Sequence, residues 1–148
     1  MAEGYLELGM LDDAQRVFEE LGALERRHPQ VQMLLLQLLI RRQSWDEAIL
    51  LGRTLIAGEA GVDEAYLHTA YCMHETGRTR EARELLLEAP QSMHGDALFH
   101  YNLACYEAVL GASERALYHL DKSIALNPAF KQQAMVDPDL KSLRSRAG

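Results

Sequence analysis

Small apolar residues recur along this chain at a fixed interval. One column with a period of 34 residues consists of Ala14, Ala48, Ala82 and Ala116. A second column, twelve positions upstream, consists of Ala2, Ala70 and Ala104. Because paired helices approach closely only where no bulky side chain intervenes, this spacing predicts stacked helix-turn-helix units.

The pattern places the helices on either side of short turns. It predicts helices over residues 1–8, 11–26, 29–42, 45–58, 63–76, 79–89, 96–110 and 113–126. Gly9, Gly77 and Gly111 fall five residues before three of the alanines, where each turn is expected. Glycine takes a positive φ there without steric penalty. Pro90 should end the preceding helix early, which predicts a mobile loop over residues 91–95.

The order of residues around these columns is similar in successive stretches. One stretch contains Leu103, Ala104, Gly111, Ala116, Leu120, Ser123 and Pro128, and the stretch before it contains Tyr66, Ala70, Gly77, Ala82, Leu86 and Ala89. An earlier stretch keeps the helix opening Trp45-Asp46-Glu47-Ala48 but departs from the others at three positions. It has Leu36 at the small position, Gln43 in place of the turn glycine, and Gly52 where a bulky apolar residue is usual. The first stretch is partial, with Tyr5, Gly9, Ala14 and Phe18. In this order the chain resembles the tetratricopeptide repeat (TPR) family.

The resemblance covers residues 1–128 and is specific for fold, not for function. It implies an all-α, right-handed superhelical array of antiparallel helix pairs, a TPR-type α-solenoid. After a partial first unit, complete units should start near residues 29, 63 and 97. Residues 129–148 are expected to form a C-terminal helical cap, because Asp137-Pro138-Asp139-Leu140 is similar to an element that closes bacterial arrays of this family.

A cap is needed because the last unit of a stack otherwise leaves an apolar face in water. The residues expected to seal it are Phe130, Met135, Leu140 and Leu143. The N-terminal end shows no matching device. This suggests an excised array, a partner that completes the array, or a homodimer formed through that end.

Composition narrows the functional classes. With 148 residues, 48% of them hydrophobic and 25% charged, the chain is expected to form one domain. It has no apolar run of membrane-spanning length, and its acidic start does not resemble a secretory signal. The formal net charge of -7, without a Lys/Arg stripe, argues against nucleic acid as a partner. Cys72 and Cys105 form no CxxC motif, which favours a reduced, cytoplasmic setting.

The resemblance implies that the first helix of each unit lines a concave groove. The implied positions are Met33, Leu34, Gln37, Ile40 and Arg41, then Leu67, His68, Tyr71, His74 and Glu75, then Tyr101, Asn102, Cys105, Ala108 and Val109. Among them we select as candidate partner-binding residues Gln37, Arg41, His68, Tyr71, His74, Asn102 and Cys105. Family members often use asparagine at the Asn102 position to hold a peptide backbone, since its amide both donates and accepts. The alternative for Asn102 is a hydrogen bond to a neighbouring side chain.

The groove positions also indicate the kind of partner. Some family members seize a C-terminal carboxylate with a basic clamp, but here Arg41 is the only Lys or Arg at these positions. The aromatic and mixed polar residues instead favour a neutral or weakly basic segment, or another helix, as the ligand.

A metal or catalytic interpretation rests on His68, Tyr71, His74 and Cys105, because imidazole and thiolate are good transition-metal ligands. The spacing argues against it. His68 and His74 are six residues apart, and no carboxylate pair or HExxH motif accompanies them. We therefore expect no metal, no cofactor and no catalytic residue, and we interpret His28, His94, His100 and His119 as surface or packing histidines.

The sequence thus favours a non-enzymatic protein-interaction module, a scaffold or assembly factor that binds a peptide or helix in its groove. Two alternatives stay open. One is a small acidic chaperone that holds an apolar partner subunit. The other is a metal-binding enzyme or sensor.

Overall fold

The chain consists of two compact units, an N-terminal unit (residues 1–72) and a C-terminal unit (residues 73–148). The computed structural model describes residues 16, 19–22, 28–58 and 63–147, with side chains as far as residue 144. The partial first repeat predicted before residue 29 falls largely outside these ranges. Within them every regular element is a helix and no strand occurs, which confirms the all-α fold class.

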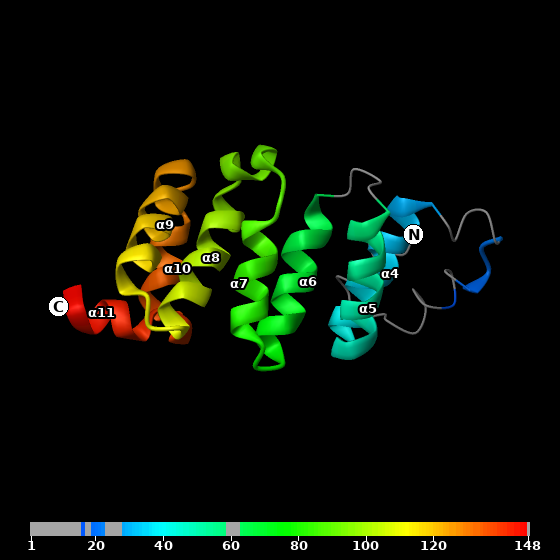
Figure 1. Cartoon of the computed structure of the whole chain (residues 1–148), viewed down its shortest axis with the longest axis horizontal. Helices are drawn as coiled ribbons and strands as arrows, with labels where there is room; N and C mark the ends of the chain where they lie inside the picture. Colours follow the sequence, from blue (N-terminus) through cyan, green and yellow to red (C-terminus); the bar gives the residue numbers. More distant parts are fainter. Residues whose placement is uncertain (1–15, 17–18, 23–27, 59–62, 148) are drawn as a thin grey trace. The chain divides into compact units, whose positions relative to one another are not determined.

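In the N-terminal unit, α4 (Pro29–Arg41) packs against α5 (Trp45–Ala57) (Figure 1). The next helix, α6 (Glu64–Glu75), begins in this unit and ends in the other. Pro29 occupies the first turn of α4, where its missing N–H would have no partner within the helix. His28 caps the same helix, since its Nδ1 accepts the Gln30 N–H at 3.2 Å. The predicted helix boundaries hold to within a residue here.

Gly52 shows how this unit accommodates a departure from the family pattern. It lies on α5 where a bulky apolar residue is usual, and Thr69 of α6 fills the space instead. A Cβ atom built at Gly52 would overlap Thr69 Oγ1. Thr69 is fully buried, as is Leu36, which stands at a position usually held by a small residue. The Thr69 side chain thus takes the volume that a larger residue at position 52 would fill.

The three turns within helix pairs share one backbone conformation. Gly77 and Gly111 have φ values of +80° and +86°, which confirms the predicted turn glycines. Gln43 occupies the same place and takes a φ of 60°, a value that a residue with a Cβ rarely adopts. The repeat geometry thus overrides the local preference of glutamine.

In the C-terminal unit, α7 (Thr79–Leu87) is followed by α8 (Ala97–Val109) and α9 (Ser113–Leu126). The pair α8 and α9 forms the most extensive helix contact of this unit (Figure 1). Ala104, Ala116 and Ser123, the predicted small positions, are all fully buried. Ser123 also donates its hydroxyl to the Ala97 carbonyl at 2.8 Å, which ties the end of α9 to the start of α8.

The connection between α7 and α8, which we predicted as a mobile loop, has regular structure. It forms a 3₁₀ helix, η1 (Gln91–Gly95), closed by backbone hydrogen bonds from Met93 to Pro90 and from Asp96 to Met93. Met93 is 5% exposed. Burial of this side chain accounts for the order that the sequence pattern did not show.

The C-terminal segment forms the predicted helical cap from α10 (Phe130–Val136), η2 (Pro138–Leu140) and α11 (Lys141–Ala147). Leu140 and Leu143 are buried, as expected for seals. Met135 is not a seal, because it is 64% exposed and Ala134 takes the inward position on α10. Phe130 is half-buried and stacks on Tyr101 with 4.9 Å between ring centroids.

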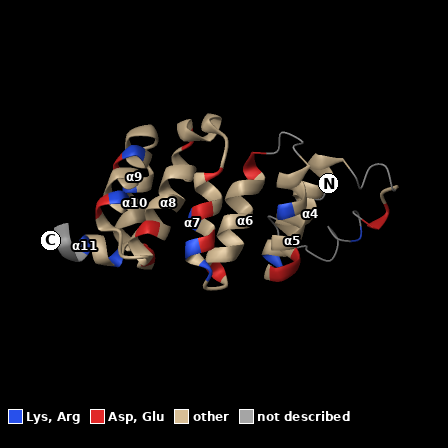
Figure 2. Cartoon of the chain, viewed as in Figure 1, with Lys and Arg blue, Asp and Glu red and all other residues tan. Residues whose placement is uncertain are grey.

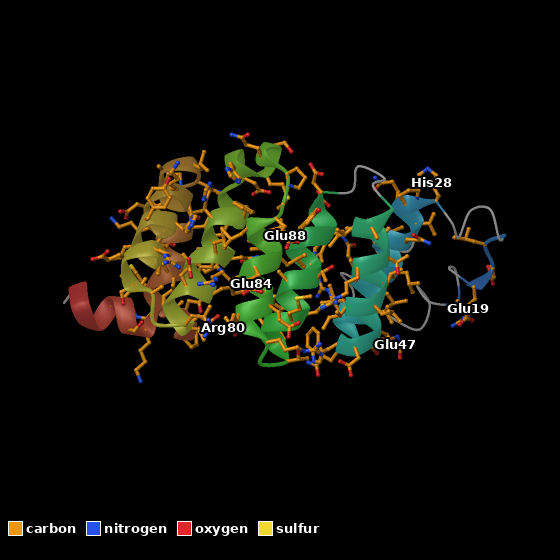
Figure 3. All side chains as sticks on the ribbon, in the orientation of Figure 1. Glu19, His28, Glu47, Arg80, Glu84 and Glu88 are labelled. Atoms are coloured by element: carbon orange, nitrogen blue, oxygen red, sulfur yellow. The ribbon has the colours of Figure 1, made fainter. Side chains whose placement is uncertain are left out.

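The described surface mixes acidic and basic residues. Figure 2 shows both signs side by side on α7. Arg80, Glu84 and Glu88, labelled in Figure 3, are exposed and recur every four residues along α7 and its C-cap, so they share one solvated face. Among the described residues, no helix is long and apolar enough to span a membrane.

Candidate partner-binding site

The N-terminal unit presents four of the candidate residues. Gln37 is half-buried and Arg41 is exposed on α4, whereas His68 is half-buried and Tyr71 is 40% exposed on α6. Tyr71 packs against the edge of Trp45, with 6.0 Å between ring centroids and a 67° interplanar angle. This contact fixes one side of the Tyr71 ring and leaves a large aromatic surface in water.

His68 is a neutral group at this surface. Burial lowers its pKa, and the negative charge of Glu64, one turn earlier on α6, opposes that shift. A neutral imidazole offers one donor and one acceptor. His68 is therefore suited to hydrogen bonding with a polar ligand rather than to attracting an anion.

The remaining candidates lie in the C-terminal unit, and the cap covers two of them. Cys105 is 5% exposed on α8, next to the buried Tyr101, while Asn102 is half-buried. Asp137, at the start of η2, accepts hydrogen bonds at its Oδ2 from the Tyr101 hydroxyl at 2.6 Å and from the Cys105 thiol at 3.7 Å. The Tyr101 and Cys105 side chains of α8 are thus covered by the chain itself.

His74 is also held by the cap. Its Nε2 lies 2.9 Å from Asp139 Oδ2, and its Nδ1 lies 2.8 Å from the Thr79 hydroxyl. Its ring also contacts Tyr106, with 4.9 Å between centroids. Both nitrogens therefore have partners within the unit. His74 thus links the start of α7 to the Asp137–Leu140 segment, and its role in partner binding stays a prediction.

The Tyr101 hydroxyl and the Cys105 thiol keep their protons at neutral pH. Burial raises the pKa of both Tyr101 and Cys105, and the neighbouring Asp137 carboxylate raises each further. The phenol and thiol therefore remain hydrogen-bond donors at neutral pH. A nucleophilic role for Cys105 would need the thiolate, which this environment disfavours.

The same residues form a candidate metal cluster. One ligand atom each from Cys105, Asp137 and Asp139 lies within 4.8 Å of the others. This grouping was not predicted, because the two aspartates were interpreted only as part of a cap motif. Each donor already has a hydrogen-bond partner, and the thiol is protonated. These hydrogen bonds join the cap to the end of α6 and to α8.

Two further polar contacts were not expected from the sequence. Glu107 on α8 is 2% exposed and accepts a hydrogen bond from Arg83 Nη1 at 3.3 Å. His100 on α8 pairs with His119 on α9. Both histidines were expected as surface or packing residues, and no spacing rule on a single helix could have paired side chains from two different helices.

Comparisons with known proteins concern the fold. No family model matches the chain, and no curated protein matches it. Among solved structures it is similar to MamA MSR-1 C2, a TPR-type protein, with a TM-score of 0.69 and 20% sequence identity. The alignment covers 86% of this chain and 74% of that chain. The likeness shows that this chain has a TPR-like helical repeat fold.

Proposed function

We propose that the chain is a non-enzymatic protein-interaction module, a scaffold or assembly factor that binds a peptide or helix on the inner faces of its repeats. The TPR-like fold supports protein partners in general. In this proposal residues 1–128 form the repeats, with units starting near 29, 63 and 97, and residues 129–148 form the cap. The two free cysteines are consistent with a cytoplasmic location.

The observation that carries the proposal is the exposure of Tyr71. A large aromatic side chain, 40% exposed and supported by Trp45, is the kind of anchor that dominates binding energy at interfaces. Gln37, Arg41 and His68 add polar and charged groups in the same unit. In the C-terminal unit, Asn102 offers its amide to a ligand backbone, whereas His74 and Cys105 contribute only if the cap gives up its hydrogen bonds to them.

The proposal is tested by selecting binders to the full chain from a displayed library of random peptides. Tyr71→Ala should weaken the binding of the selected peptides by about 2 kcal/mol, or roughly thirtyfold in Kd, because the aromatic anchor is lost. Glu47→Gln is the matched control, since Glu47 is exposed on α5 of the same unit (Figure 3). Titration calorimetry gives the Kd, and unchanged helical circular dichroism shows that both variants fold.

Peptides that bind equally well to the parent and to Tyr71→Ala would contradict this assignment. A chain that selects no peptide but keeps one apolar protein subunit soluble at a fixed stoichiometry would support the chaperone alternative instead.

A further inference from the structure

A histidine pair joins α8 to α9 in the C-terminal unit. His100 on α8 is 4% exposed, and His119 on α9 is half-buried. Their Nδ1 atoms are 3.1 Å apart, and the ring centroids are 5.3 Å apart with a 24° interplanar angle. The two nitrogens therefore face each other between the rings, at the distance of a hydrogen bond.

The position of the protons follows from a third contact. His100 Nε2 lies 2.8 Å from the backbone carbonyl of His94 in η1. A carbonyl only accepts, so Nε2 of His100 carries hydrogen. In a neutral His100 ring the Nδ1 atom is then an acceptor, and Nδ1 of His119 must donate. One proton lies between the two rings.

We propose that this pair is an acid-sensitive contact that holds α8 against α9 while the rings are neutral and weakens as acid charges them. The atom of His100 that takes up a further proton is Nδ1, the acceptor itself. Once protonated, it becomes a donor, and the hydrogen bond persists only if His119 moves its own hydrogen to Nε2 and accepts at Nδ1. When both rings are charged, two N–H groups face each other and the hydrogen bond is lost. Protonation of His119 at Nε2 instead places a second charge beside Lys122 in a partly buried position.

The charged groups around the pair oppose protonation on balance. Among the described residues, those acting on it are His94 from η1, Asp96 at the start of α8 and Lys122 on α9. Asp96 alone favours the charged form of His100 through its own charge, whereas Lys122 and His94 disfavour it. The ring of Tyr118 covers another side of His119, with 5.1 Å between centroids.

The pKa values follow this geometry. Burial lowers the pKa of His119 to about 4, helped by the charges of His100 and Lys122. Burial also lowers the pKa of His100, although its hydrogen bond to the His94 carbonyl opposes the shift. An unfolded chain, with histidine pKa values near 6.5, binds protons first as the pH falls. Stability contributed by the pair is therefore complete above pH 6.5 and is lost as the pH falls toward 4.

His119→Gln in the full chain provides the test. The glutamine amide can donate to His100 Nδ1 but does not titrate, so the contact should survive in acid. Hydrogen exchange of α8 and α9 amides, corrected for intrinsic rates, is compared between about pH 7 and about pH 5. The parent should lose protection by up to about tenfold per pH unit for each shifted histidine, and His119→Gln should lose less. His28→Gln, at an exposed histidine of the other unit, should behave like the parent.

A second measurement keeps the proposal open to refutation even if His119→Gln fails to fold. Ring NMR signals of the parent chain give each histidine pKa directly. A His119 that titrates near its ordinary value of 6.5 would overturn the proposal, as would equal pH dependence in the parent and in His119→Gln.

Discussion

The two units use the same repeat position in different ways. Gln37, Tyr71 and Cys105 stand 34 residues apart, at equivalent places on α4, α6 and α8. Tyr71 is 40% exposed, whereas Cys105 is 5% exposed beneath Asp137 of the cap. The repeat register thus fixes which face of the helix a residue occupies. Whether that face meets solvent depends on what the rest of the unit places over it.

The two units also differ in the residue that occupies the turn within each helix pair. Gln43 in the N-terminal unit and Gly77 and Gly111 in the C-terminal unit are also 34 residues apart, and all three have a positive φ. Only glycine takes this conformation without steric cost. The N-terminal unit therefore stores strain at a point where the C-terminal unit has none.

The largest expected effect comes from opening the cap. Leu140→Ala removes a side chain that is 1% exposed and should cost the C-terminal unit about 2–5 kcal/mol in free energy of unfolding. Because the cap covers Cys105, iodoacetamide should modify that thiol at least about tenfold faster in the variant. Mass spectrometry of the two cysteine peptides measures both rates, with Cys72 of the other unit as the internal reference.

Met135→Ala, at an exposed residue of the cap, is the control and should change neither the free energy of unfolding nor the rate of Cys105 modification. An equal Cys105 rate in Leu140→Ala would show that the cap does not control access to α8.

A smaller effect is expected from overfilling the contact between α8 and α9. Ala116 is fully buried, so Ala116→Leu should lower the free energy of unfolding by about 1–3 kcal/mol. Ala125→Leu, at an exposed position of the same helix, is the control and should stay within about 0.5 kcal/mol of the parent. Urea unfolding followed by circular dichroism gives both values. Identical midpoints for the two variants would mean that the register assigned to the small positions is wrong.

The smallest effect concerns the turns. Gln43→Gly should stabilise the N-terminal unit by about 1 kcal/mol, because glycine relieves the strain of a positive φ. Gly77→Gln should destabilise the C-terminal unit by a similar amount, although nothing lies within 4 Å of the added Cβ. Opposite shifts in thermal midpoint are therefore expected for these two exchanges. Shifts of the same sign would show that the two turns are not equivalent.

The sequence by itself determined the repeat, because the features that specify it are local. Small residues at a fixed period and a turn residue five positions before them specify a helix pair without reference to distant segments. The helices predicted at 45–58 and 113–126 accordingly appear as Trp45–Ala57 and Ser113–Leu126. The resemblance to the TPR family then implied which residues of each first helix face inward, and that assignment stays a prediction.

The tertiary structure alone decided which of those residues are available. Asp137 lies 36 residues from Tyr101 in the chain, and their hydrogen bond forms only when the cap folds back onto α8. The fit of Thr69 against Gly52 likewise depends on two helices meeting at one point. The periodicity of one helix carries no information about what packs against it. Burial, proton positions and access to the candidate site therefore emerge only when distant segments are brought together.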